Sequence, residues 1–379
     1  MRFGWRLMYF VAILSLLHAY IGWRLVPDLG AAPVQIAGAA VVIGSLATML
    51  LAILARGRLP RLRAARFAGP GLFMAGFFSL MLVFTLLRDL VLLVGALTLS
   101  PAAEYTLRSI TAFSVVALAV IATAVGFAAA RRRARIVNVD VPIPNLPEAL
   151  HGFSIAQISD VHVGHSIRKE YVDAIVDAVN GLRPDLIAVT GDIVDGPVGE
   201  LGSHTAPLGR LTSRHGTFLV TGNHEYYAGV GPWIVEFRRL GLNVLLNEHA
   251  VLTHDGAPLV VAGVTDFSSH HFNPQQRSDP AAALAGAPLN AGARILLAHQ
   301  PRSAAAAATA GYDLQLSGHT HGGQFWPWNL FVRFQQPFTA GLHRLNRLWV
   351  YVSRGTGYWG PPNRFGAPSE ITRLRLVPG

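Results

Sequence analysis

The chain has 379 residues, of which 51% are hydrophobic and only 14% are charged, whereas an ordinary soluble domain carries about 25% charged residues. This composition excludes intrinsic disorder and a single fully soluble globule, and the lack of cysteine excludes thiolate metal sites, disulfide scaffolds and cysteine nucleophiles. The formal charge of +10 lies entirely in residues 1–140, which hold 14 arginines and 4 acidic residues, because residues 141–379 hold 17 basic and 17 acidic side chains. A basic surface that binds nucleic acid belongs on a folded polar domain, so we expect no nucleic-acid partner.

Four apolar stretches in the first third are long enough to cross about 30 Å of hydrocarbon. They are Leu7–Val26, Pro33–Ala55, Gly71–Leu87 and Ile110–Ala130. The first begins like a signal peptide after Arg2 and Arg6, but three more spans follow and no small-residue cleavage site ends it, so we interpret it as an anchor. The sequence therefore predicts a transmembrane region with about four helices over residues 1–135 and a second domain over residues 136–379.

The third stretch is interrupted by Arg88-Asp89 and then resumes as Leu90–Leu99. As one helix, residues 71–99 would be about 43 Å long at 1.5 Å per residue. That length exceeds the hydrocarbon core, so the helix must tilt, break or project. The charged pair then lies either at the membrane–water interface or inside the bundle, where a buried ionised pair would have a function.

Arginines flank these spans unevenly. Eleven precede the first span, separate the second from the third or follow the fourth, whereas the two remaining loops contain only Arg24 and Arg108. Loops rich in arginine face the cytoplasm, so the N-terminus and everything after Ala130 are predicted to be cytoplasmic. Anionic membrane lipids are expected partners of these arginines.

Beyond Arg135, short apolar runs alternate with helical patterns. Apolar residues recur at helical spacing over residues 171–179, and Gly181 then ends the pattern. Strand-like runs are Ile136–Val141, Phe153–Ser159, Leu186–Thr190, Phe218–Val220, Leu259–Val261, Ile295–Ala298, Leu314–Leu316 and Trp349–Val352. Strands that alternate with helices predict an α/β architecture.

Polar residues of a restricted kind follow five of these strands. They are Asp160 and His162, Asp192 and Asp195, Asn223-His224-Glu225, His299, and His319 and His321. In open α/β folds, sites form beyond the carboxyl ends of strands, so we expect these side chains to converge. Oxygen and imidazole donors without thiolate suit Mn²⁺, Fe or Zn²⁺, and two cations need a shared carboxylate with ligands on both sides. The sequence therefore predicts a centre for two divalent metal ions, with Mn²⁺ preferred and Fe or Zn²⁺ as alternatives.

The motif set resembles that of the calcineurin-like metallophosphoesterase superfamily over roughly residues 136–379. It consists of Asp160-x-His162, Gly191-Asp192-x-x-Asp195, Gly222-Asn223-His224-Glu225, His299 and Gly318-His319-Thr320-His321. The resemblance implies a metallophosphoesterase αββα sandwich, in which helices flank two sheets. The expected fold class is therefore α/β, with a four-helix transmembrane region followed by this catalytic domain.

The resemblance also implies a role for each residue. One metal would be held by Asp160, His162 and His321, and the other by Asn223, His299 and His319. Asp192 would bridge both metals. His224 would act near the leaving group as an acid or charge stabiliser, and Asp195 would orient its neighbours.

The C-terminal stretches Ser353–Gly357 and Pro361–Pro368 resemble a bacterial branch of the superfamily with membrane-associated members. That branch includes phosphodiesterases and enzymes similar to the UDP-diacylglucosamine pyrophosphatases of the lipid A pathway. Together with the four spans and the arginine distribution, this predicts a multi-pass protein of a bacterial inner or plasma membrane whose catalytic domain is cytoplasmic. Arg354 and Arg364 either contact substrate phosphates or are ordinary structural arginines.

A catalytic domain attached to four spans favours an amphiphilic phosphorylated substrate. We expect metal-dependent hydrolysis of a lipid-linked phosphodiester or pyrophosphate. The alternatives are a tethered phosphatase or phosphodiesterase that acts on soluble nucleotides, and a membrane sensor or scaffold with a vestigial metal site. The aromatic stretch Phe325–Phe331 either meets the membrane interface or completes the core beneath the active-site loops.

Overall fold

The structure is a computed structural model that describes residues 2–59 and 61–379. Its contacts divide the chain into two compact units. The first extends to Ala129 and also includes Gly360–Phe365, and the second comprises Ala130–Trp359 and Gly366–Gly379. The chain therefore leaves the second unit at Gly360 and returns to it at Gly366.

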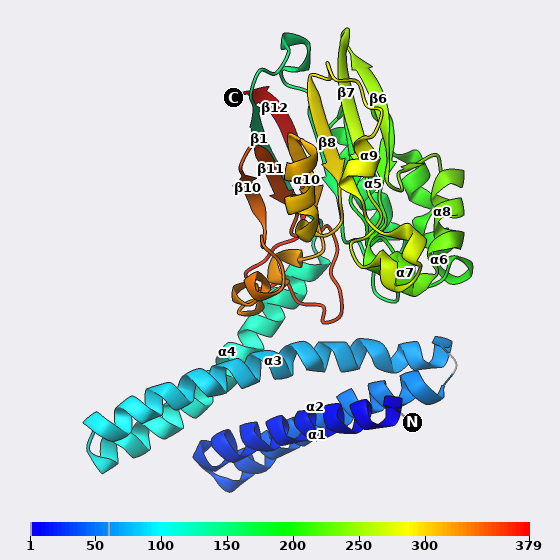
Figure 1. Ribbon diagram of the computed structural model, residues 1–379. Coiled ribbons are helices and arrows are strands. Elements are labelled where there is room, and N and C mark those ends of the chain that lie inside the picture. The colour runs from blue at the N-terminus through cyan, green and yellow to red at the C-terminus, as the bar shows by residue number, and fades with distance from the viewer. Residues whose placement is uncertain (1, 60) are drawn as a thin grey trace. The chain divides into compact units, whose positions relative to one another are not determined.

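The first unit is built from long helices, coloured blue to cyan in Figure 1. They are α1 (Arg2–Leu25), followed by η1 (Val26–Asp28), α2 (Ala32–Arg58), α3 (Arg61–Thr98) and α4 (Pro101–Arg131). All four α-helices are long and apolar enough to cross a bilayer, which confirms the predicted four-helix transmembrane region. Helix α3 runs without a break through Arg88-Asp89, and its 38 residues correspond to about 57 Å at 1.5 Å per residue.

Arg88 and Asp89 lie within this unit, and both side chains form hydrogen bonds with its other residues. Arg88 is only 2% exposed, and its guanidinium donates to the carboxylate of Asp28, to the Thr111 hydroxyl at 3.0 Å, and to the carbonyls of Arg24 and Arg108 at 2.6 and 3.0 Å. Asp89 accepts from Nε of Arg24 at 2.8 Å and from the Tyr20 hydroxyl. A buried charge is tolerated when its hydrogen bonds are satisfied, so this network connects α1, α3 and α4.

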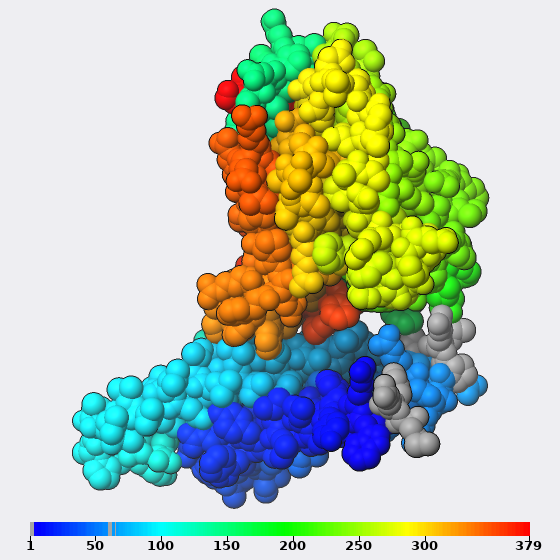
Figure 2. Space-filling model, in the orientation of Figure 1, coloured from blue at the N-terminus to red at the C-terminus, as the bar shows by residue number. Residues whose placement is uncertain are grey.

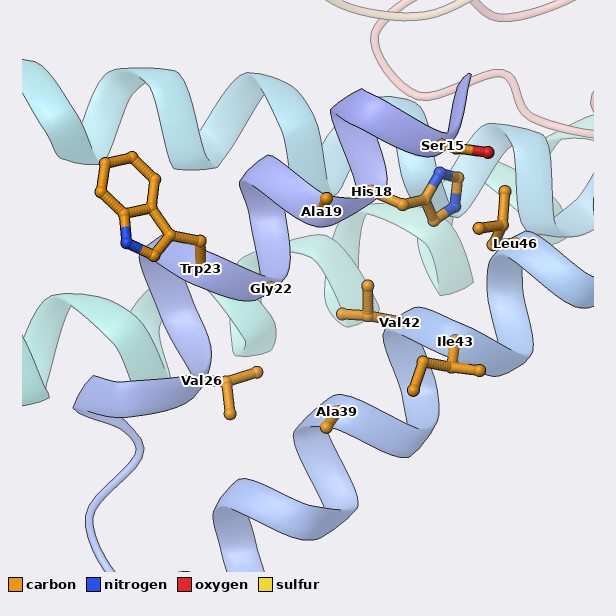
Figure 3. A pocket seen from close by; sticks show the side chains of 10 residues that line it. All are labelled: Ser15, His18, Ala19, Gly22, Trp23, Val26, Ala39, Val42, Ile43 and Leu46. Atoms are coloured by element: carbon orange, nitrogen blue, oxygen red, sulfur yellow. The ribbon is translucent and has the colours of Figure 1, made fainter. Parts of the chain in front are cut away.

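An open groove of about 420 Å³ lies between α1 and α2 (Figure 3). Its lining is mostly small or aliphatic, with Ala19, Gly22, Ala39 and Val42 among the lining residues. Ser15 and His18 are its polar lining residues, and the ring nitrogens of His18 lie 2.8 Å from the Leu14 carbonyl and 3.3 Å from the Ser45 hydroxyl. This groove contains none of the predicted metal ligands.

The second unit contains two six-stranded sheets (Figure 1). The first sheet has the order β1 (Arg135–Ile143), β12 (Glu370–Pro378), β2 (Ser154–Ile158), β3 (Leu186–Val189), β4 (Thr217–Leu219), β5 (Asn243–Val244). The second has the order β10 (Gly341–Leu345), β11 (Leu348–Val352), β9 (Leu314–Ser317), β8 (Ala293–Leu297), β7 (Ala257–Gly263), β6 (Glu248–His254). Strands β2 to β5 are parallel neighbours, as are β7, β8, β9 and β11, so the carboxyl ends within each set share one edge.

Successive side chains of a strand point to opposite faces of its sheet, so each sheet has two faces to cover. One face packs against the other sheet, and the opposite face packs against helices. In β3, Leu186 and Ala188 face the core between the sheets, whereas Ile187 and Val189 face the helices on the outer side. The helices that cover the first sheet are α5 (Lys169–Gly181), α6 (Val198–Thr205) and α8 (Val230–Arg239). Helices α9 (Pro280–Leu284) and α10 (Ala304–Ala310) cover the second sheet, and Figure 2 shows their yellow to gold atoms on the near face. The expected αββα sandwich is confirmed.

The predicted helix over residues 171–179 lies in α5, where Val172, Ile175, Val176 and Val179 are buried on one face. All eight strand-like runs coincide with strands. Four further strands were not predicted: β5, β6, β10 and β12. Strands β6 and β10 are largely half-buried or exposed and mix polar with apolar residues, so their local pattern is weak.

A histidine pair lies at the amino ends of the strands, opposite the candidate ligands. Nε2 of His215 is 3.0 Å from Nδ1 of His254, and both rings contact Phe153. Burial lowers the pKa of His215, and the charges of His254 and Arg214 lower it further, while Asp185 and Asp255 act in the opposite direction.

This pair predicts a loss of stability in mild acid. Because the pKa of His215 is lower in the folded state than its ordinary 6.5, the unfolded chain takes up this proton more readily. The stabilising contribution is therefore complete above about pH 6.5 and is lost as the pH falls through the folded-state pKa. We expect the unfolding temperature of His215→Asn to change less between pH 7 and pH 5 than that of the wild type. The control is replacement of the exposed His151 by Asn; an equal effect of the two substitutions would contradict the prediction.

Candidate metal centre

The carboxyl ends of five strands bring the predicted ligands together. Asp160 and His162 follow β2, Asp192 follows β3, Asn223 and His224 begin α7 (Asn223–Ala228) after β4, His299 follows β8, and His319 and His321 follow β9. Every one of these positions is at the same edge of its sheet because the strands of each set are parallel. The arrangement agrees with the expectation for open α/β folds.

Two groups of ligand atoms are compact. Donor atoms of Asp160, His162 and His321 all lie within 4.8 Å of one another, and the Nε2 atoms of the two histidines are 3.0 Å apart. Donor atoms of Asp192, His299 and His319 form the second such group. There, Nε2 of His299 is 3.1 Å from Oδ2 of Asp192 and 3.2 Å from Nδ1 of His319.

Asp192 lies between the two groups. Its Oδ2 atom, close to His299, is also 3.9 Å from Nε2 of His162, which belongs to the first group. Its Oδ1 atom accepts a hydrogen bond from the backbone N–H of His224 at 2.8 Å, which orients the carboxylate. A third compact group joins Asp192 with His162 and His224.

Two observations test whether these residues fit bound metal ions. The Oδ1 atom of Asn223 is buried and has no hydrogen-bond partner among the described residues, which is unusual for a buried carbonyl and is explained by a cation. Gly222 and Gly318 leave room for ligands, since a Cβ at these positions would lie 2.2 Å from Oδ1 of Asp192 and 2.1 Å from Oδ2 of Asp160. Carboxylate, amide and imidazole donors fit divalent ions such as Mn²⁺ or Zn²⁺.

The backbone is strained at five of the seven predicted ligands. Their φ angles are positive: Asp160 at 53°, His162 at 56°, Asp192 at 54°, His319 at 70° and His321 at 52°. The left-handed region costs a non-glycine residue on the order of 1 kcal/mol and persists only when the surroundings impose it. Strain of this kind clusters at functional sites.

Asp195 orients two imidazoles at once. Its Oδ1 atom lies 2.8 Å from Nδ1 of His162 and 2.7 Å from Nδ1 of His224, so both rings donate their Nδ1 proton to it. The Nε2 atom of His162 then faces the ligand group, and the Nε2 atom of His224 is available to a bound molecule because this side chain is 14% exposed. Burial lowers the pKa of His224, but the hydrogen bond to Asp195 and the charges of Asp192 and Asp195 outweigh burial and raise it above 6.5.

Glu225 is a site residue whose role sequence reasoning missed. It is fully buried, and its carboxylate accepts backbone N–H groups of Gly222 at 2.7 Å, Ile193 at 2.7 Å, Asp192 at 3.0 Å and Val194 at 3.3 Å. It therefore joins the loop after β3 to the loop after β4. The available signal was its position three residues after the helix-capping Gly222, which is the spacing of a capping box. Burial and the charge of Asp192 raise the pKa of Glu225 to about 7, against the opposing effect of the backbone donors.

We expect Glu225→Gln to destabilise the catalytic domain by about 2–4 kcal/mol. The amide nitrogen of Gln would face backbone N–H groups, which leaves buried donors without an acceptor. Because Asp192 is one of the residues held by Glu225, bound metal should also decrease. Thermal unfolding and elemental analysis check this, with exposed Glu170→Gln on α5 as the control. An unchanged unfolding temperature and metal content would show that the Glu225 carboxylate is not needed to hold the two loops.

The segment after β11 supports the Asp160 loop from the other side. The N–H of Gly357 donates to the carbonyl of Asp160 at 3.0 Å, and the N–H of Thr356 donates to that of Ser159 at 2.7 Å. Arg354 is paired with the buried Glu370 at 2.9 Å. Arg364 is 1% exposed, belongs to the first unit, and its backbone N–H donates to the Gly126 carbonyl of α4 at 2.9 Å. Contact of either arginine with substrate stays a prediction.

The aromatic stretch after the last predicted ligand is only partly buried, and its contact with a membrane interface stays a prediction. Phe325 is buried, as expected for a core residue. Trp328 and Phe331 are 41% and 50% exposed, so they do not complete the core.

Comparison with known proteins was consistent with this geometry. Residues 153–323, which contain every predicted ligand, match the family of calcineurin-like phosphoesterases. A transmembrane protein with metallophosphoesterase domain from Danio rerio is 37% identical over 278 residues, which are 70% of this chain and 63% of that protein. An uncharacterised metallophosphoesterase from Helicobacter pylori is 38% identical over 67% of this chain and 66% of its own length. One from Campylobacter jejuni is 34% identical over 77% of this chain and 77% of its own length.

The match to the Danio rerio protein thus spans less than two thirds of its length. The Campylobacter jejuni protein is matched over more than three quarters of its own length, well beyond the ligand motifs alone. The chain therefore belongs to the calcineurin-like metallophosphoesterases, a family of metal-dependent phosphoester hydrolases.

Proposed function

We propose that this protein is a membrane-anchored hydrolase that uses two divalent metal ions to cleave a phosphodiester or pyrophosphate bond in a lipid-linked substrate. The observation that carries the proposal is the position of Asp192 between two compact ligand groups, with Oδ2 3.1 Å from His299 and 3.9 Å from His162. A shared carboxylate with ligands on both sides is what a two-metal site requires.

The two compact groups, and the unpartnered Oδ1 atom of Asn223, support the ligand roles that the motif set implies. Asp160, His162 and His321 would hold one ion, and Asn223, His299 and His319 would hold the other, with Asp192 shared between them. Mn²⁺ is the first choice for these donors, and Fe or Zn²⁺ are alternatives. When bound, the ions supply Lewis acidity and a water that ionises near neutral pH.

The protein's own residues then account for orientation and proton transfer. Asp195 holds the Nδ1 proton of His224, so Nε2 of His224 can hold the proton that the departing oxygen needs. The same carboxylate keeps His162 in the tautomer that directs Nε2 toward the ligand group. Glu225 holds the Asp192 loop in place through backbone hydrogen bonds.

Two features support a lipid-linked substrate. The same chain carries four helices that are long and apolar enough to span a bilayer, and the Danio rerio relative is named as a transmembrane protein. Exposed aromatic side chains such as Trp328 and Phe331 follow the last ligand loop, and aromatic rings favour the membrane interface. The complete ligand set argues against a sensor or scaffold with a vestigial site.

We infer that the catalytic domain lies on the cytoplasmic side of a bacterial plasma membrane. The uneven distribution of arginines around the spans supports this orientation. Because the chain has no cysteine, single cysteines can report the side directly. Exposed Thr212→Cys should react with a membrane-impermeant maleimide only in opened cells, and Ser100→Cys, between α3 and α4, in intact cells. The reverse pattern would contradict the orientation.

The activity is tested with full-length protein in detergent and Mn²⁺. The panel consists of bis(4-nitrophenyl) phosphate, phospholipids, lipid-linked pyrophosphates and soluble nucleotides, with Asp192→Asn as the inactive control. We expect metal-dependent turnover with the highest kcat/KM on a lipid-linked member. Higher kcat/KM on nucleotides would favour the tethered nucleotide phosphatase, and no turnover of any phosphoester would overturn the hydrolase itself.

A further inference from the structure

Two aromatic side chains lie beside His224, and a third lies beside one of them. The ring centroids of Tyr227 and Trp359 are 5.2 and 5.6 Å from that of His224, and Phe272 is 5.6 Å from Tyr227. They come from α7, from the loop after β7 and from the segment after β11, so the fold gathers them from positions far apart in sequence. We call Tyr227, Phe272 and Trp359 the aromatic rim.

The rim is exposed although it is apolar. Tyr227 is 64% exposed, Phe272 is 50% exposed and Trp359 is 52% exposed. Single exposed aromatic residues need no explanation, but a contiguous group at the mouth of a candidate active site is a feature of binding sites. Large aromatic surfaces gain the most free energy when a ligand covers them.

The backbone holds the rim in a defined place. The N–H of Trp359 donates to Oε1 of Gln324 at 2.8 Å, and Nε2 of Gln324 donates back to the Trp359 carbonyl at 2.6 Å. Gln324 is itself buried and follows the His321 ligand by three residues. Tyr227 follows His224 by three residues on α7 and therefore shares its helix face. Tyr227 and Trp359 are thus positioned through the segments that carry His224 and His321.

We propose that the aromatic rim binds an apolar alkyl or acyl chain on the leaving group of the substrate. The proposal rests on the proposed function, because it takes His224 as the residue nearest the departing oxygen. The four long apolar helices of the same chain favour an alkyl chain over a planar group. Tyr227 and Trp359 meet the His224 ring at 66° and 76°, and Tyr227 meets Phe272 at 58°, so the neighbouring rings are not stacked on one another.

Direct binding of small phosphonates tests the rim independently of turnover. Methylphosphonate, hexylphosphonate and phenylphosphonate would be titrated by calorimetry into Mn²⁺-loaded full-length protein in phosphatidylcholine nanodiscs, with empty nanodiscs as the blank. Each methylene that leaves water strengthens binding, so the wild type should bind hexylphosphonate at least about tenfold more tightly than methylphosphonate. Trp359→Ala and Tyr227→Ala should reduce this ratio to about threefold or less while methylphosphonate binds unchanged.

Phe334→Ala is the matched control, because Phe334 is 74% exposed and lies outside the rim. A wild-type ratio near one would overturn the rim as a chain-binding site, as would equal losses in Phe334→Ala and Trp359→Ala. Tighter binding of phenylphosphonate than of hexylphosphonate would overturn the alkyl assignment in favour of an aromatic leaving group. Hydrolysis of bis(4-nitrophenyl) phosphate is measured on the same preparation. Turnover without a chain-length preference in binding would refute the chain-binding role of the rim and leave the proposed function intact. Absence of turnover would refute the proposed function, and the titrations would still decide whether the rim binds a chain.

Discussion

Asp192→Asn is expected to lose at least one bound metal ion and most of the hydrolytic activity. Oδ2 of Asp192 lies 3.1 Å from Nε2 of His299, 3.9 Å from Nε2 of His162 and 4.0 Å from Nε2 of His224, so a single oxygen faces both ligand groups. The Asn amide is neutral, and one of its two terminal atoms is an NH₂ group that can only donate hydrogen bonds. It therefore cannot supply the negative charge that two cations share.

Bound metal should fall from two ions per chain to one or fewer, and kcat/KM should fall by more than about 10³-fold, beyond the loss caused by removing a single oxyanion donor. Elemental analysis of the purified protein and hydrolysis of bis(4-nitrophenyl) phosphate measure the two effects. Asp177→Asn is the matched control, because Asp177 is an exposed acid paired with Arg210 on the surface. If Asp192→Asn retained both ions, Asp192 would not be the shared ligand.

His224→Ala is expected to retain metal and lose activity. The side chain meets the rest of the site through Asp195, 2.7 Å from its Nδ1, while its Nε2 remains available to a bound molecule. Removal of a general acid typically costs about 10²–10⁴-fold in rate. The metal content should change little, because the two compact groups that include Asp160 and His299 do not depend on His224.

The leaving group makes this prediction sharper. 4-Nitrophenolate departs readily without a proton, whereas an alkoxide needs one, so His224→Ala should impair an alkyl ester much more than a 4-nitrophenyl ester. Equal losses on both substrates would show that His224 stabilises charge or structure rather than supplying the proton. A large loss of metal would instead identify His224 as a ligand, as its compact group with His162 and Asp192 allows.

The convergence of the predicted ligands could be predicted from the sequence because they lie just after apolar runs. Asp160, Asp192 and His299 come within a few residues of a buried strand, and parallel strands necessarily present their carboxyl ends at one edge. The αββα architecture followed from the resemblance of the motif set rather than from periodicity. Strand β12 was not predicted, since its position between β1 and β2 depends on partners far along the chain. Strand β6 forms a local hairpin with β7 and was missed because its residues mix polar with apolar types.

The supporting residues were not readable in the same way. The Glu225 carboxylate accepts hydrogen bonds from the backbone N–H groups of Asp192 and Ile193, more than 30 residues away. The Gln324 side chain forms hydrogen bonds with the main chain of Trp359. Contacts between a side chain and a distant backbone leave no periodic pattern in the sequence. The same is true of Arg88, whose partners lie on helices that composition alone does not pair.

The amino-acid sequence by itself determined which segments are long and apolar enough to span a bilayer and which oxygen and imidazole donors are present, because both are local properties of residue type and spacing. The tertiary structure alone decided which donors face one another, that Asp195 fixes two imidazole tautomers, and that exposed aromatic rings gather beside His224. Those relations depend on how loops from separate strands approach one another in space, and the free energy that fixes them comes from packing and hydrogen bonds between residues far apart in the chain.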